Sequence, residues 1–196
     1  QTTFSYLGGE SCYSALDWHS APNPMPDYYR YMPGYAANPE VAAAVREAWE
    51  SRDPDVTQVN WDELYYVNRH GTATPASYAV GGAVTANRCF QFVSSFEYRM
   101  SGLNRLRGGV QIRNDRTSRY QRLEDLLGGD YLLNVDSYLI DDEYYGDKIQ
   151  NDLQHPNRRV GVGERYGYDY DLDYSSYGAW VLADLHSTRE AGLYGY

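Results

Sequence analysis

Hydrophobic and polar side chains alternate with a period of two in several segments after residue 76. In CFQFVSSFEYRM (89–100) one parity carries Phe90, Phe92, Phe96, Tyr98 and Met100, and the other carries Gln91, Ser95, Glu97 and Arg99. In RLRGGVQIRN (105–114) one parity carries Leu106, Val110 and Ile112, and the other carries Arg105, Arg107, Gln111 and Arg113. Because successive side chains of a strand point to opposite faces, these segments predict long strands with one apolar and one polar face.

The segment RYGYDYDLDYSS (165–176) alternates more strictly than any other part of the chain. One parity carries Tyr166, Tyr168, Tyr170, Leu172 and Tyr174, and the other carries Gly167, Asp169, Asp171 and Asp173. This pattern predicts a strand with aromatic rings on one face and carboxylates on the other.

Residues 1–75 lack this period and are expected to form a loop region with one helix. Their segment YSALDWHSAPNPMPDYYRYMPGY places prolines among aromatic residues, which favours ordered but irregular backbone. A helix is predicted near 39–51, with Asn38 as its N-cap and Pro39 at its first position. Its apolar stripe at helical spacing consists of Val41, Ala44, Val45, Ala48 and Trp49.

Residues 76–196 are expected to carry the strands, interrupted by a second long loop near 116–160. Within that loop SRYQRLEDLLGG (118–129) predicts a short helix that ends at Gly128. The polar segment that follows it predicts irregular backbone, and the last residues are again expected to be extended.

Two folds could contain such strands. One is a soluble antiparallel sheet with one face on a core, and the other is a transmembrane β-barrel, whose strands need only about 9–11 residues to cross a bilayer. The aromatic-rich apolar faces and the long connections favour the barrel, since hairpin loops are usually only about two to five residues long. A mean hydropathy of -0.67 is compatible with a barrel, whose strands are only half apolar.

Several long strings resemble a group of bacterial TonB-dependent outer-membrane receptors. They are FSYLGGE, ALDWHSAPNPMPDYYRYMPGY, VNWDELYYVN, LLGGDYLLNVDSY and IQNDLQHPNRRVGVGERYGYDYDLDY, in this order, and the likeness covers nearly the whole chain. The resemblance implies a barrel of about 22 strands, filled by a plug, that imports large or scarce nutrients. It also implies that the inner-membrane TonB complex drives import by pulling on the plug.

Compared with that family, we expect the chain to lack the signal peptide, the TonB-contact segment, the plug and the final barrel strand. We therefore expect an interior segment of such a receptor: mainly β, with antiparallel barrel strands and long extracellular loops that carry short helices. The implied location is the bacterial outer membrane with the loops facing outward. The implied partners are membrane lipid, the remainder of the receptor with its plug, and through the plug the TonB complex. A surface lipoprotein is a further partner that the resemblance leaves open.

The expected function is binding and import of a nutrient, which could be a glycan, a peptide or a chelate. A different class of function is a soluble cell-surface binding module with a Tyr-rich face for glycan or protein. The net charge of -10 argues against a nucleic-acid partner, because it offers no long basic stripe for phosphates. The arginines between 105 and 122 are diluted by acidic neighbours.

No constellation of residues indicates an enzyme. The four histidines His19, His70, His155 and His186 are scattered and lie outside any ligand-spacing motif. Cys12 and Cys89 show no metal-binding spacing, so a metal site is not expected; they could form a disulfide in an oxidising compartment, and the sequence leaves open whether they meet. The acidic segment 141–143 with Asp147 could bind Ca²⁺ in an extracellular loop, or could simply be solvated.

Aromatic residues are concentrated in the predicted first loop region and are the candidate ligand-binding residues. Their flat faces and polar tips suit contact with sugars or peptides, although they could instead pack the loops against one another. They are Trp18, Tyr28, Tyr29, Tyr31, Tyr35, Trp61, Tyr65 and Tyr66.

On the barrel reading, the two rows of segment 165–176 face different surroundings. We expect the tyrosine row to face lipid or its interface, and Asp169, Asp171 and Asp173 to face a water-filled lumen.

Overall fold

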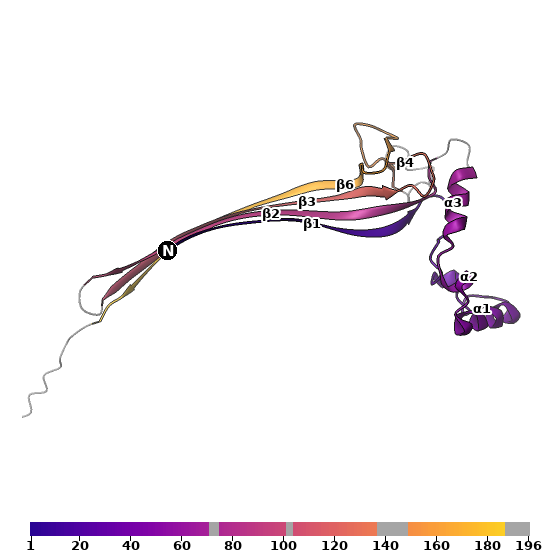
Figure 1. The fold of residues 1–196 in the computed structure, drawn as a ribbon, viewed down its shortest axis with the longest axis horizontal. Coiled ribbons are helices and arrows are strands. Elements are labelled where there is room, and N and C mark those ends of the chain that lie inside the picture. The colour runs from indigo at the N-terminus through magenta and orange to yellow at the C-terminus, as the bar shows by residue number, and fades with distance from the viewer. Residues whose placement is uncertain (71–74, 101–103, 137–148, 187–196) are drawn as a thin grey trace, which may run out of the picture. The chain divides into compact units, whose positions relative to one another are not determined.

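The computed structural model describes residues 1–70, 75–100, 104–136 and 149–186, and it has a mainly β architecture with short helices (Figure 1). The strands are β1 (Thr2–Trp18), β2 (Tyr78–Arg99), β3 (Arg105–Asp125), β4 (Leu132–Leu133), β5 (Arg159–Val160) and β6 (Arg165–Asp184). The helices are the 3-10 helix η1 (Tyr29–Tyr31), α1 (Pro39–Ser51), α2 (Pro54–Thr57) and α3 (Trp61–His70).

Four long strands form one antiparallel sheet in the order β1-β2-β3-β6. Residues 100–104 connect β2 to β3, whereas the long segments 19–77 and 126–164 make the other two connections. In an antiparallel sheet of neighbouring strands the connections alternate between the two ends, so both long connections leave the same end. Among the described residues β1 and β6 are edge strands, and the sheet does not close into a barrel.

A second, two-stranded sheet lies within the connection between β3 and β6. Strand β4 pairs antiparallel with β5, with Leu132 opposite Val160 and Leu133 opposite Arg159. Leu132 and Val160 are both fully buried, so this small ladder closes over a core.

The prediction of loop structure for residues 2–18 is wrong, because they form β1. The segment is rich in small and polar residues, and its strand conformation depends on contacts with β2. The ring of Phe4 lies 4.8 Å from that of Phe92, and Thr2 Oγ1 lies 2.9 Å from Ser94 Oγ. Such cross-strand pairs stabilise a strand whose own sequence shows little periodicity.

The helix predicted within residues 118–129 is also wrong, since β3 continues to Asp125. Tyr120 and Leu123 are buried there, and pairing in the sheet prevails over their helical spacing. The helix predicted near 39–51 is confirmed as α1, where Asn38 Oδ1 accepts a hydrogen bond of 2.8 Å from Glu40 N. Helix α3 was not predicted, although Asn60 Oδ1 caps its first turn by accepting from Glu63 N.

The contacts divide the chain into two compact units. Unit 1 contains residues 1–10, 85–118 and 171–196, and unit 2 contains residues 11–84 and 119–170. Unit 2 holds all the buried hydrophobic side chains of the described residues. They form one cluster around Leu123, Leu132, Val160 and Tyr166, and another around Leu64, Tyr78 and Leu127.

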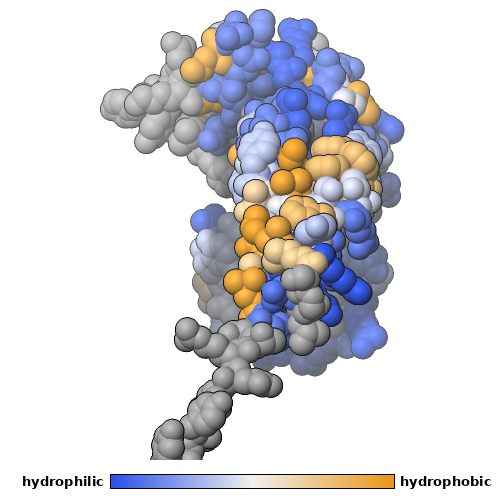
Figure 2. Space-filling model, turned by 90° about the vertical axis from the view of Figure 1, so that its left-hand side faces the viewer, coloured by the Kyte–Doolittle hydropathy of each residue, from blue (hydrophilic) through white to orange (hydrophobic). Residues whose placement is uncertain are grey.

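Unit 1 buries no hydrophobic side chain among its described residues, and its large apolar side chains lie at the surface. Phe4 is 69 % exposed, Phe96 54 % and Val110 45 %. Figure 2, which looks at the end of unit 1 that carries the β2–β3 connection, shows hydrophobic side chains at the molecular surface. We call the face that carries Phe4, Phe90, Phe92 and Phe96 the Phe face.

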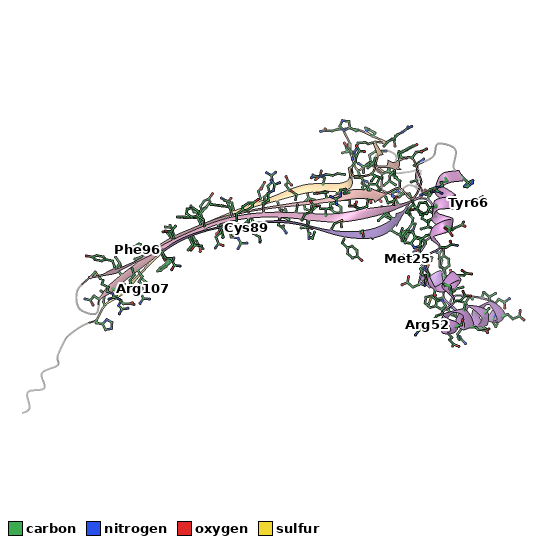
Figure 3. All side chains as sticks on the ribbon, viewed as in Figure 1. Met25, Arg52, Tyr66, Cys89, Phe96 and Arg107 are labelled. Carbon is green, nitrogen blue, oxygen red and sulfur yellow. The ribbon has the colours of Figure 1, made fainter. Side chains whose placement is uncertain are left out.

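The opposite face of unit 1 carries ion pairs and is called the ion-pair face. Glu97 lies within 4 Å of Arg99, Arg105 and Arg107, and Arg107 Nη2 donates to Asp184 Oδ2 at 2.7 Å. Phe96 and Arg107 are labelled in Figure 3. Strands β2 and β3 of unit 1 therefore present Phe rings on one side and, around Glu97, paired charges on the other.

In unit 1 the acidic residues of β6 lie on the face that carries the Phe rings. Arg116 reaches Asp171 Oδ2 at 2.5 Å and Asp173 Oδ1 at 3.6 Å. Arg116 shares the parity of Gly108, which the Phe96 ring covers. These acidic residues therefore lie on the Phe face.

The other parity of β6 lies on the ion-pair face. The Trp180 ring covers Gly109, and Gln111 covers Gly178. Leu172 and Tyr174 share the parity of Trp180 and so lie on this face. Pairing with Arg116 on β3 decides this orientation of β6, and the assignment of either row to lipid or to a lumen stays a prediction.

One buried side chain joins α3 to the ends of two strands of unit 2. Asn68 is 8 % exposed, and its Nδ2 donates to the carbonyl oxygens of Tyr78, Leu126 and Leu127 at 2.7–3.3 Å. Its Oδ1 accepts from the backbone N–H groups of Ser77 and Tyr78 at 2.9 and 3.1 Å. The single carboxamide thereby satisfies backbone groups that would otherwise be buried without partners.

We predict that Asn68→Leu destabilises unit 2, because it leaves several buried backbone groups without partners. The free energy of unfolding should fall by about 3 kcal/mol, measured from urea unfolding followed by tryptophan fluorescence. Asn114→Ala, which changes an exposed asparagine, is the control and should leave the unfolding curve unchanged. Equal stability of Asn68→Leu and the wild-type protein would contradict this role.

Candidate functional site

The eight aromatic residues predicted to bind ligand do not form one surface. Tyr28, Tyr29, Tyr31 and Tyr35 contact one another, with ring centroids 4.8–5.4 Å apart in edge-to-face geometry. Arg30 Nε donates to the Tyr29 hydroxyl at 2.9 Å. This cluster packs part of the loop against itself, while Tyr29, Tyr31 and Tyr35 remain exposed. Ligand binding by these rings stays a prediction.

The other four aromatic residues have separate surroundings. Trp18 and Tyr65 pack against the core cluster of Leu64, Tyr78 and Leu127. Tyr66 is exposed and stacks on His70 at 4.1 Å, and Trp61 is half exposed. Met25, Arg52 and Tyr66, labelled in Figure 3, belong to this helical part of unit 2.

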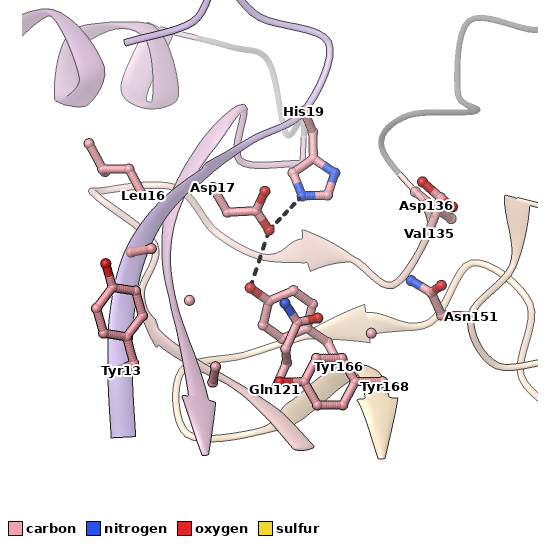
Figure 4. A pocket seen from close by; sticks show the side chains of 14 residues that line it. Tyr13, Leu16, Asp17, His19, Gln121, Val135, Asp136, Asn151, Tyr166 and Tyr168 are labelled. Atoms are coloured by element: carbon pink, nitrogen blue, oxygen red, sulfur yellow. Dashed lines mark hydrogen bonds and ion pairs between the residues drawn. The ribbon is translucent and has the colours of Figure 1, made fainter. Parts of the chain in front are cut away.

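A polar cavity of about 500 Å³ lies on the sheet residues of unit 2, and we call it the Asp17 pocket (Figure 4). Every long strand contributes to it, together with residues that flank β4 and β5 in sequence. Its polar and aromatic lining consists of Tyr13, Asp17, His19, Gln121, Asp136, Asn151, Tyr166 and Tyr168.

A three-residue network forms one wall of the pocket. Tyr166 Oη donates to Asp17 Oδ2 at 3.2 Å, and His19 Nε2 lies 3.4 Å from the same oxygen (Figure 4). Gly81 leaves room for the Tyr166 hydroxyl, which would clash with a Cβ atom at that position. The glycine thus admits the ring that orients Asp17.

Burial and hydrogen bonding shift the pKa values of this network. Burial opposes ionisation of Asp17, but its hydrogen bonds with His19 and Tyr166 outweigh burial, so the pKa of the Asp17 carboxyl is lowered. Burial, and after it the negative charge of Asp17, raise the pKa of the Tyr166 phenol. Asp17 is therefore a carboxylate and Tyr166 a neutral donor at neutral pH.

Buried Asn134 positions the opposite wall. Its Oδ1 accepts from Gly167 N at 2.8 Å and from Asn151 Nδ2 at 3.3 Å. Gly167 has a φ of 63°, a left-handed conformation that favours glycine. This conformation turns the backbone between Tyr166 and Tyr168. The arrangement fixes Asn151 and both tyrosines around the cavity.

The lining of the pocket offers mainly hydrogen-bonding and aromatic groups. It combines carboxylates, carboxamides and tyrosines, and the described residues that line the pocket include no lysine or arginine. Sequence reasoning missed Asp17, His19 and Tyr166 as site residues. Asp17 and Tyr166 lie far apart in the chain, and only the order of the strands brings their side chains together.

A second, more apolar cavity of about 480 Å³ lies among the helices and the tyrosine cluster of unit 2. Met25, Tyr31, Val41, Val45 and Val56 contribute to its walls. Arg30, Asp55, Gln58 and Asn60 add polar groups to this lining.

The two cysteines occur as thiols. Cys12 Sγ donates to Glu124 Oε1 at 3.6 Å, and Cys89 lies beside Asp115. The described residues include no group of three or more potential metal ligands. The acidic segment 141–143 with Asp147, considered for Ca²⁺, lies outside the described residues.

Comparison of the chain with protein-family models, with curated proteins and with solved structures gave no match. Within the part of the chain that the structure describes, no helix has the length and apolar character needed to cross a membrane.

The lowered pKa of Asp17 predicts a pH effect on stability. The ionised carboxyl of Asp17 stabilises the folded protein at pH values above 3.8, the ordinary pKa of this group. This stabilisation is lost as the pH falls below 3.8 through the lower folded-state pKa. Between neutral pH and about pH 3 the wild-type protein should lose more of its free energy of unfolding than Asp17→Asn. Urea unfolding at both pH values checks this, and equal losses would show that Asp17 has no such role.

Proposed function

We propose that the chain forms part of the wall and outer rim of a TonB-dependent outer-membrane receptor, which binds and imports a nutrient. The observation that carries the proposal is unit 1, a sheet with an exposed Phe face, an ion-pair face and no buried hydrophobic side chain among its described residues. In a barrel wall the Phe face would contact lipid and the ion-pair face a wet lumen.

Strand length and connectivity support a barrel wall. The four long strands have 17, 22, 21 and 20 residues, more than the 9–11 that a tilted strand needs to cross the hydrocarbon core. The short connection and the two long ones leave opposite ends of the sheet, as periplasmic turns and extracellular loops do. We therefore assign the strands of unit 1 to the bilayer and the two long connections to extracellular loops.

The charges on the Phe face limit which part of it could contact lipid on this proposal. On the Phe face the aromatic residues Phe92 and Phe96 are apolar, whereas Arg116, Asp171 and Asp173 form ion pairs. Charges on the outer surface of a barrel are tolerated only towards or beyond the interface, where their cost falls to about 0–1 kcal/mol. The charged group would then mark the outer border of the lipid-facing band.

The Asp17 pocket lies on the sheet residues of unit 2. Tyr13, Asp17, Gly81 and Gln121 bring three strands of that unit together at the pocket. A site in the unit that carries both long connections suits a receptor that captures its cargo before transport.

The edge strands imply the principal partners. Unpaired backbone groups are not tolerated in lipid, so β1 and β6 would pair with further strands of the receptor. On this proposal the remaining partners are membrane lipid, the plug and, through the plug, the TonB complex.

Phe92→Lys and Gln91→Lys test the proposal on neighbouring positions of β2 that point to opposite faces. A lysine in place of Phe92 would face lipid and should weaken insertion by about 2–4 kcal/mol if it lies near the midplane, whereas one in place of Gln91 would face water. The measurement is the heat-modifiable gel mobility of the intact receptor in isolated outer membranes.

Equal insertion of both variants would contradict the assignment of the Phe face to lipid. A soluble binding module is the competing function, and it predicts a monodisperse protein that needs no detergent. That outcome, together with normal folding of Phe92→Lys, would replace the transport proposal.

A further inference from the structure

We infer that the Asp17 pocket binds a positively charged group of the cargo, an ammonium or a guanidinium. This inference rests on the proposed function, which makes the pocket a cargo site. It narrows the cargo to molecules that carry an exposed basic group, such as peptides with basic side chains or polyamines.

The charge of the lining is the first argument. The carboxylates of Asp17 and Asp136 line the pocket, and its described lining includes no lysine or arginine. An anionic cargo would bring a further negative charge next to these carboxylates, which is unfavourable at short range. The net charge of -10 also favours the approach of cations.

The second argument is the way in which Asp17 is held. Tyr166 Oη and His19 Nε2 both contact its Oδ2, and Tyr166 is itself buried. A carboxylate offers about four acceptor sites, so this network fixes the side chain while leaving capacity for donors of a ligand. A fixed acceptor loses less conformational entropy on binding than a mobile one does.

Aromatic and amide groups complete a site for a cation. Tyr13 and Tyr168 line the pocket and are 76 % and 41 % exposed, so their ring faces are accessible for cation–π contacts. Gln121 and Asn151 add carboxamide oxygens that can accept further N–H donors. The volume of about 500 Å³ accommodates a basic head group together with its aliphatic stem.

The test is isothermal titration calorimetry of the intact receptor in detergent with four probes: trilysine, spermidine, the neutral sugar maltotriose and the anion citrate. Trilysine and spermidine distinguish a peptide from a polyamine as the source of the ammonium group. The variants are Asp17→Asn and Asp136→Asn. The matched control is Asp169→Asn. Asp169 is an exposed carboxylate that pairs with Arg165 and does not line the pocket.

We expect at least one of the two cationic probes to bind the wild-type protein, and maltotriose and citrate not to compete with it. Asp17→Asn should weaken the binding about tenfold, because it removes a charge-assisted hydrogen bond, while Asp169→Asn should leave the affinity unchanged. Circular dichroism and heat-modifiable mobility of each variant separate loss of binding from loss of folding.

Tighter binding of maltotriose or citrate than of both cations would overturn the inference, as would unchanged affinity in Asp17→Asn. In either case, normal membrane insertion of the same preparation would leave the receptor function standing. Failure of the wild-type protein to insert would instead count against the proposed function.

Discussion

The rest of this molecule depends on one constraint: β2 and β3 of unit 1 carry Phe rings on one face and paired charges around Glu97 on the other, and the described residues of unit 1 bury no hydrophobic side chain. Rings such as Phe4 and Phe96 are exposed on one face, and Glu97 pairs with arginines on the other. Water would suit the second face and penalise the first, since exposed aromatic surface loses the free energy of burial. A boundary between lipid and water satisfies both faces at once, and this is the physical basis of the receptor proposal.

Unit 2 is stabilised in a different way, by conventional burial. Two clusters of apolar side chains pack beneath α3 and the small β4–β5 sheet, and Asn68 satisfies the backbone groups where α3 meets the strand ends. The same packing places Asp17, His19 and Tyr166 around a common cavity. The packing of unit 2 therefore holds the side chains of the Asp17 pocket in place, and ligand-binding side chains need such rigid support to keep their geometry.

Local signals were sufficient to predict part of this structure from the sequence. Asn38 and Pro39 define the start of α1, and the alternation around Phe92 and Gln111 identifies β2 and β3. Non-local contacts decide the remainder. Strand β1 forms through pairs such as Phe4 with Phe92, and the acidic row of β6 turns toward Arg116, which a period within one strand cannot reveal. The Asp17 pocket was missed for the same reason, since Asp17 and Tyr166 meet only through strand order.

Accessibility of spin labels at positions 91 and 92 of β2 tests the central claim most directly. Each label would be attached to a cysteine introduced in a background with Cys12 and Cys89 changed to serine, and the receptor would be reconstituted in lipid vesicles. The account predicts that a label at 92 is relaxed mainly by oxygen, which concentrates in lipid, and that a label at 91 is relaxed mainly by a water-soluble nickel complex. Relaxation of both labels by the nickel complex to the same extent would show that the Phe face does not contact lipid.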